Sequence, residues 1–262
     1  MASRKIVATI EARMGSSRLP GKVLLPALGK PMLQHMIDRV RRSAHVQEVV
    51  IAMPIGAEND PIADLATQLG VSHYRGSEDD VLLRVVGAAR SCDADVVVQL
   101  TGDCPVVDPA HIDECVDRYL EGGWDYVANE IVRTYPIGFD IAVMATDLLA
   151  STLDEPDLTN ADREHVTTYI VDRPERFRQF NVQAPPYLDR PDLQVTLDTP
   201  EDYQVLKQVF ELLLPQKPHF RAEDVIALLL ERPGLADINR LIKRKPKKPS
   251  TTPTPPHSAA TS

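Results

Sequence analysis

A run of small and cationic residues early in the chain could bind a polyphosphate. It reads Ala12-Arg13-Met14-Gly15-Ser16-Ser17-Arg18-Leu19-Pro20-Gly21-Lys22. Glycine and serine let backbone N–H groups approach an anion closely, and Arg13, Arg18 and Lys22 can pair with phosphate oxygens. The run is not a Walker A loop, because five residues separate its two glycines and Val23 stands where Ser or Thr would be. An ordinary surface loop is the alternative interpretation.

Two aspartates could hold a divalent metal beside such a polyphosphate. Asp103 follows the apolar run Asp95–Leu100, and Asp198 follows the apolar run Leu193–Leu197. Mg²⁺ prefers carboxylate oxygens and usually binds together with substrate phosphates. Either aspartate alone could be a turn residue, but Asp198 precedes the N-cap residue Thr199 and is not needed for that cap. Together with the cationic loop, the pair predicts a metal–triphosphate site.

A third group, Arg163-Glu164-His165, opens an apolar helical pattern. It could face a bound molecule or form an exposed first turn. None of the three groups forms a site unless the fold brings them together.

The elements that must position these groups can be read from hydrophobic periodicity. In the first half, strand-like runs alternate with helical patterns, which is typical of a parallel sheet with helices on both faces. The expected strands there are Lys5–Ile10, Glu48–Met53, Val71–Tyr74 and Asp95–Leu100, and the expected helices are Pro31–Ser43, Asp60–Leu69, Asp79–Arg90 and Pro109–Glu121. The carboxyl ends of such strands are where open α/β sheets bind ligands.

The second half is less regular, and we expect it to add an antiparallel hairpin at the mouth of the sheet. The expected strands are Tyr126–Asn129, Asp140–Met144, Phe177–Val182 and Leu193–Leu197, and the expected helices are 161–172, Pro200–Leu214 and Ala222–Leu230. No linker interrupts residues 1–242, so we expect a single domain there. Residues 243–262 are basic, rich in Pro, Thr and Ser and almost without apolar content, which predicts a disordered tail.

Composition excludes several classes of protein. The 262 residues carry 29 Lys and Arg against 38 Asp and Glu, for a net charge of −9. Since the tail holds five of the basic residues, the remainder is strongly acidic, and we expect no nucleic-acid partner. No apolar run approaches the ~20 residues of a membrane helix, so we expect no membrane insertion. Three cysteines without metal-ligand spacing (Cys92, Cys104 and Cys115) suit a reducing cytoplasm.

The motifs together resemble the cytidylyltransferase family of CMP-sugar synthetases, which includes acylneuraminate and Kdo cytidylyltransferases. The most similar branch is that of spore coat polysaccharide biosynthesis protein F. The resemblance covers about Lys5 to Phe210 and rests on IEARMGSSRLPGKVL, RGSEDDVLLR, QLTGDCPVVDP, RTYPIGFD, REHVTTYI and LDTPED.

The resemblance implies a three-layer α/β/α fold like that of nucleotide-diphospho-sugar transferases. It also implies transfer of CMP from CTP to a small anionic acceptor, with release of pyrophosphate and with Mg²⁺ or Mn²⁺ as cofactor. The implied catalytic residues are Arg13, Arg18, Lys22, Asp103 and Asp198, of which the two aspartates hold the metal. The implied nucleotide-binding residues are Ala12, Arg13, Met14, Gly15, Ser16, Ser17, Arg18, Lys22, Arg75, Gly76, Ser77, Asp80, Gln99, Thr101, Gly102 and Asp103. The implied acceptor-binding residues are Gly138, Asp140, Arg163, Glu164 and His165.

Other functions stay open at this level. A glycosyltransferase of similar fold would use a DxD motif after a strand, but Asp93-Ala94-Asp95 precedes its strand. A phosphonate cytidylyltransferase would share the CTP site and differ in its acceptor. A nucleotide-binding module without turnover could lose Asp103 or Asp198, and both are present. The acceptor and the oligomeric state are undetermined, with a homodimer among the alternatives.

Overall fold

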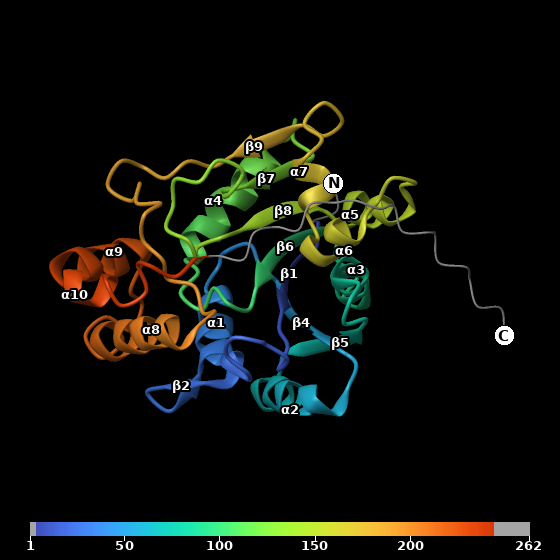
Figure 1. Cartoon of the computed structure of the whole chain (residues 1–262). Coiled ribbons are helices and arrows are strands. Elements are labelled where there is room, and N and C mark those ends of the chain that lie inside the picture. Colours follow the sequence, from blue (N-terminus) through green and yellow to red (C-terminus); the bar gives the residue numbers. More distant parts are fainter. Residues whose placement is uncertain (1–3, 244–262) are drawn as a thin grey trace.

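The main sheet forms the centre of the molecule. The computed structural model describes residues 4–243, and its strands follow the spatial order β5-β4-β1-β6-β8-β7-β9 (Figure 1). These strands are β1 (Ile6–Glu11), β4 (Glu48–Pro54), β5 (Ser72–Gly76), β6 (Val96–Thr101), β7 (Tyr126–Ala128), β8 (Ala142–Ala145) and β9 (Gln179–Asn181).

The sheet is mostly parallel, as expected. Within it, β1 pairs in parallel with β4 and β6, and only β8 runs antiparallel to its neighbours β6 and β7. A separate two-stranded antiparallel sheet joins β2 (Pro26–Ala27) and β3 (Lys30–Pro31). The expected fold class is therefore confirmed, but the separate hairpin lies in the first half of the chain rather than the second.

Helices cover both faces of the sheet (Figure 1). Alternate residues of β1 point to opposite sides: Ile10 packs in one core with Leu33 of α1, while Val7 packs in another with Leu82 of α3. Each face therefore buries its own apolar layer, which is the three-layer arrangement. The helices are α1 (Met32–Val40), α2 (Asp60–Leu69), α3 (Val81–Ser91), α4 (Pro109–Leu120), α5 (Thr146–Ser151), α6 (Asn160–His165), α7 (Thr168–Val171), α8 (Pro200–Leu213), α9 (Ala222–Glu231) and α10 (Pro233–Ala236). Short 3₁₀ helices span Lys22–Leu24, Ala57–Asn59 and Thr152–Asp154.

A third core lies beside the sheet and carries the segment that ends in Asp198. Helices α8, α9 and α10 pack together at one side of the molecule (Figure 1). Phe210 and Phe220 contact each other edge-on in this core, with ring centroids 5.7 Å apart, and Leu197 is buried in it. Leu197 thereby anchors the backbone immediately before Asp198.

Two expected elements differ in the structure. The helix expected over 161–172 is broken into α6 and α7, because Val166 has a positive φ of 57°. The strand expected over Leu193–Leu197 is only an extended segment with a single bridge between Ile137 and Gln194. Its partner segment has a positive φ of 114° at Gly138, which is not a strand conformation.

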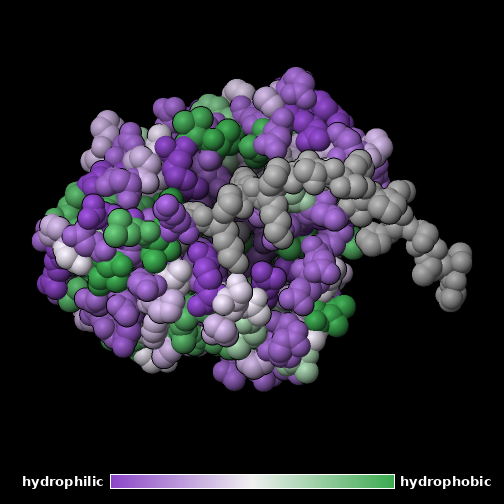
Figure 2. Space-filling model, in the orientation of Figure 1, coloured by the Kyte–Doolittle hydropathy of each residue, from purple (hydrophilic) through white to green (hydrophobic). Residues whose placement is uncertain are grey.

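The surface seen in Figure 2 is largely hydrophilic, with hydrophobic residues in separate groups. In residues 4–243, we find no helix long and apolar enough to cross a membrane. The tail expected over 243–262 lies, apart from Lys243, outside the described residues.

Candidate active site

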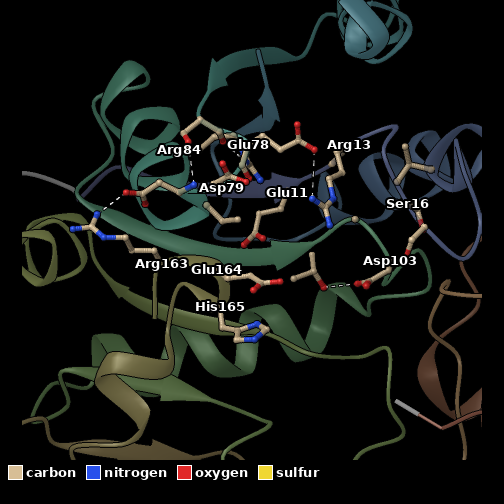
Figure 3. Close-up of a pocket in the computed structure, with 18 of the residues that line it drawn as sticks. Glu11, Arg13, Ser16, Glu78, Asp79, Arg84, Asp103, Arg163, Glu164 and His165 are labelled. Atoms are coloured by element: carbon tan, nitrogen blue, oxygen red, sulfur yellow. Dashed lines mark hydrogen bonds and ion pairs between the residues drawn. The ribbon is translucent and has the colours of Figure 1, made fainter. Parts of the chain in front are cut away.

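A cavity of about 860 Å³ opens at the carboxyl ends of β1 and β6. Figure 3 shows side chains from several elements converging on it. The lining includes predicted residues from all three motifs: Ala12, Arg13, Ser16, Ser17, Arg18, Lys22, Ser77, Asp80, Thr101, Gly102, Asp103, Arg163, Glu164, His165 and Asp198. The fold thus brings the cationic loop, both aspartates and the α6 group to one cavity.

Backbone hydrogen bonds hold the two aspartates side by side. The Leu197 N–H donates to the carbonyl oxygen of Asp103 at 2.8 Å, and the Thr196 hydroxyl donates to the same oxygen at 3.2 Å. The cap of α8 is a reciprocal pair between Thr199 and Asp202. The carboxylate of Asp198 is not used for that cap, so it can face the cavity.

The cationic loop meets both carboxylates directly. The Lys22 Nζ lies 2.9 Å from Asp198 Oδ1 and 3.5 Å from Asp103 Oδ2, and an Arg18 Nη lies 2.9 Å from Asp198 Oδ2. Burial by itself would lower the pKa of Lys22, but Asp103 and Asp198 outweigh that effect and raise the pKa above its ordinary value. Lys22 is therefore a charged ammonium in this site.

The loop between β1 and β2 folds back on itself around Met14. The Met14 carbonyl accepts hydrogen bonds from Ser16 N–H at 2.9 Å and Gly21 N–H at 3.0 Å, while Asn59 holds the Met14 N–H at 3.0 Å. Met14 packs its side chain against the core, so it shapes the loop without lining the cavity. Arg13 points into the cavity and lies 3.7 Å from Glu78 (Figure 3).

Glycine is needed where the ends of β1 and β6 approach each other. The Gly102 N–H donates to the Glu11 carbonyl at 2.8 Å, and a Cβ at Gly102 would lie 2.6 Å from that same oxygen. This close approach places Asp103 directly beside the first residues of the cationic loop.

Glu11 lines the cavity although it was not among the predicted site residues. It ends β1, lines the large cavity, and accepts a hydrogen bond from Gln99 Nε2 at 2.5 Å. Burial raises the pKa of Glu11 to about 7, and nearby Asp103 and Glu130 add to the increase. The available sequence signal was its position as the last residue of the first strand, at the ligand-binding edge of the sheet.

A smaller cavity of about 190 Å³ adjoins the large one. The two cavities share Glu11, Thr101, Glu164 and His165 in their linings. The lining of the smaller one is Glu11, Gln99, Thr101, Glu130, Asp140, Ile141, Glu164, His165, Val166 and Thr167.

The three residues Arg163, Glu164 and His165 at the end of α6 have different surroundings. Glu164 and His165 point into the cavity (Figure 3), whereas Arg163 forms a buried ion pair at 2.5 Å with Asp80. Asp80 also caps α3 by accepting from the Leu83 N–H. Arg163 and Asp80 both line the cavity, but their charged groups pair with each other, and this ion pair holds α6 against α3.

Some predicted residues do not reach a cavity lining. Arg75 instead pairs with Asp60 at 2.5 Å and donates to the Gly56 carbonyl. The remaining predicted residues that line neither cavity are Met14, Gly15, Gly76 and Gly138. Lining residues outside the predicted set include Glu11, Val23, Glu78, Asp79, Val81, Arg84, Glu130, Ile141, Asn160, Val166 and Thr167.

The aspartate pair fits a magnesium ion that shares its coordination with phosphate. No group of three or more His, Cys, Asp or Glu side chains within residues 4–243 could hold a metal by itself. Mg²⁺ is commonly held by one or two carboxylates together with water and substrate phosphates. Asp103 and Asp198 supply such a pair, and their interaction with a lysine ammonium shows that the position attracts positive charge.

Comparisons with known proteins agree with this site. The family model described as Cytidylyltransferase matches residues 7–226. The chain is 34% identical over 235 residues to spore coat polysaccharide biosynthesis protein SpsF of Bacillus subtilis, covering 88% of this chain and 96% of that protein. The chain belongs to the cytidylyltransferase family. The expected similarity to the SpsF branch is thus confirmed.

Two solved structures are similar to this cytidylyltransferase. A cytidylyltransferase from Leptospira borgpetersenii superposes with a TM-score of 0.83 at 32% identity, covering 89% of this chain and 97% of that one. A CMP:2-keto-3-deoxy-manno-octonic acid synthetase complexed with CTP superposes with a TM-score of 0.60 at 20% identity, covering 79% and 98%. At that identity the second structure shows a shared fold.

Proposed function

We propose that this cytidylyltransferase transfers CMP from CTP to a small sugar acid and releases pyrophosphate. The observation that carries the proposal is the convergence of Arg18 and Lys22 with Asp103 and Asp198 at one cavity. Cations that can bind a triphosphate and carboxylates that can bind its metal are both required for nucleotidyl transfer, and they occur here within contact distance.

The relatives support the nucleotide and the biological setting. The name of the SpsF relative refers to spore coat polysaccharide biosynthesis, and the octonic acid synthetase was solved with CTP. We infer a role in making an activated sugar for a cell-surface polysaccharide or glycoconjugate. The carboxylate lining of the smaller cavity, from Glu130 and Asp140, offers hydrogen-bond acceptors to sugar hydroxyls.

The reaction is an in-line displacement at phosphorus. An acceptor oxygen forms a bond to the α-phosphorus of CTP while the bond from that phosphorus to the bridging oxygen of pyrophosphate breaks. Arg13, Arg18 and Lys22 bind the β- and γ-phosphates and stabilise the charge that develops on the leaving group. The chain contributes mainly by positioning both reactants and by electrostatic stabilisation.

Asp103 and Asp198 would hold a divalent metal, Mg²⁺ or Mn²⁺. When bound, the metal supplies positive charge that stabilises the phosphate oxygens in the transition state. The Thr101 hydroxyl donates to Asp103 Oδ1 at 2.6 Å and keeps that carboxylate oriented. For the remaining nucleotide contacts, we propose Ser77 and Asp80 near the base and Gln99 and Thr101 near the ribose.

The acceptor is assigned to the region where the two cavities meet. Glu164 and His165 line both cavities, and Asp140 lines the smaller one, held by Arg133 at 2.6 Å. Arg163 acts on this region indirectly, through its ion pair with Asp80. Gly138 shapes the adjoining loop by its close approach to the Val195 backbone, at 2.5 Å from an added Cβ.

Pyrophosphate release with each of the four ribonucleoside triphosphates, Mg²⁺ and a panel of sugar acids and phosphonates tests the proposal. We expect release that depends on CTP and on a sugar acid, and its loss in Asp103→Asn. Equal rates with ATP or UTP would exclude the cytidine assignment. Activity with phosphonates alone would move the acceptor to that class.

A further inference from the structure

The Lys22 ammonium contacts both of the carboxylates that would hold a metal. The two contact distances are 2.9 and 3.5 Å, and only 14% of the Lys22 side chain is exposed. Arg18 takes the other oxygen of Asp198, at 2.9 Å. The carboxylates that would hold a metal are thus already neutralised by the cations that would hold the triphosphate.

Arg18 and Lys22 cannot neutralise the two carboxylates and bind a triphosphate through the same contacts at the same time. A divalent cation held by Asp103 and Asp198 repels an ammonium ion between them, because like charges at contact distance in a partly buried site are poorly screened. A triphosphate supplies a new partner for Arg18 and Lys22, since guanidinium and ammonium groups bind phosphate oxygens well. Binding of the nucleotide therefore removes the competitor of the metal.

We propose that Lys22 is an internal counter-ion that keeps the Asp103–Asp198 site from binding a divalent metal until a nucleoside triphosphate draws the ammonium away. This inference rests on the proposed function. It makes the binding of nucleotide and metal mutually dependent, so that each increases the affinity of the enzyme for the other. The enzyme would then hold little metal when it holds no nucleotide.

The position of Lys22 in the chain allows this exchange. The adjoining Val23 is buried and keeps the backbone of the 3₁₀ helix Lys22–Leu24 in place. Only the long side chain has to rotate, over an open cavity that also receives Arg18 and Asp103. The contacts with Asp103 and Asp198 can therefore break without disturbing the fold.

The test measures Mn²⁺ binding to the full-length protein in the absence of nucleotide. The readout is the electron paramagnetic resonance signal of free Mn²⁺. We expect Lys22→Met to lower the dissociation constant for Mn²⁺ at least tenfold relative to the unmodified protein. Lys30→Met is the matched control, because it removes the same charge from an ion pair with Asp38 that lies outside both cavity linings. It should leave Mn²⁺ binding unchanged.

Two further variants keep the test decisive. Lys22→Met combined with Asp198→Asn should abolish the gain, which locates the ion on these carboxylates. If Lys22→Met does not fold, Lys22→Gln should still tighten Mn²⁺ binding, because it removes the same positive charge and keeps a polar side chain. Equal Mn²⁺ affinity in the Lys22 variant that folds and in the unmodified protein would overturn the proposal. Since no CTP or acceptor is present, an error in the proposed reaction would leave this result unchanged.

Discussion

Replacing Glu11 by glutamine should change the dependence of stability on pH. In the folded protein burial raises the pKa of Glu11 to about 7, from an ordinary value of 4.5. Between pH 4.5 and 7 the native state keeps a proton that the unfolded state has released. The free energy of unfolding of the unmodified protein therefore falls as pH rises through this window, and the loss is complete above about pH 7.

The magnitude follows from the size of the shift. A difference of roughly 2.5 pKa units, at 1.36 kcal/mol for each, amounts to about 3 kcal/mol at pH 8, as an upper value for a half-buried group. Glutamine is uncharged at every pH, and its carbonyl oxygen can still accept from Gln99. Glu11→Gln should thus be more stable than the unmodified protein at pH 8, with a melting temperature higher by up to about 12 °C.

The assay is a series of thermal melts of both proteins from pH 4.5 to pH 8. The advantage of Glu11→Gln should grow with pH and shrink toward zero near pH 4.5. Glu78→Gln is the control, since Glu78 lines the same cavity with 54% of its side chain exposed. A difference between Glu11→Gln and the unmodified protein that is constant across the pH range would refute the reasoning.

Three other predictions follow from the same structure. Asp198→Asn should lower turnover at least 100-fold in the pyrophosphate assay, with partial recovery at high Mg²⁺, because several kcal/mol of metal stabilisation is lost; unchanged kinetics would make Asp198 a turn residue only. Arg163→Met should destabilise the fold by about 3–5 kcal/mol in urea unfolding, since it removes the guanidinium that lies 2.5 Å from the buried Asp80 carboxylate; a silent change would show that the pair does not hold α6. Gly138→Ala should cost about 2 kcal/mol or more, because φ is 114° and the added Cβ would lie 2.5 Å from the Val195 backbone; an unchanged melting temperature would contradict this.

The sequence by itself determined the elements with a strong period and clear boundary residues. The helix over Asp60–Leu69 ends at Gly70, which takes the left-handed conformation with φ 58°, and Thr199 caps α8 as its position predicts. The strands β1 and β6 are mostly apolar and are buried up to their last residue, so both were evident. These features are local, and neighbouring residues are enough to specify them.

The sequence also pointed to the residues of the proposed metal and phosphate site, but not to their arrangement. Lys22 and Asp198 are 176 residues apart in the chain, and the fold brings them into contact while the Leu197 N–H bonds the Asp103 carbonyl. Sequence spacing could not show that Arg163 would form an ion pair with Asp80. These contacts depend on packing between distant segments.

Tertiary structure alone decided the break between α6 and α7 and the raised pKa of Glu11. Val166 is a good core residue in a helical pattern, yet it adopts a positive φ, and the Thr167 N–H bonds the His165 carbonyl at 2.6 Å. Glu11 looks like the polar end of a strand, and burial in the folded protein, helped by nearby Asp103 and Glu130, raises its pKa. Backbone strain and desolvation arise from the surrounding fold, so no local pattern in the sequence encodes them.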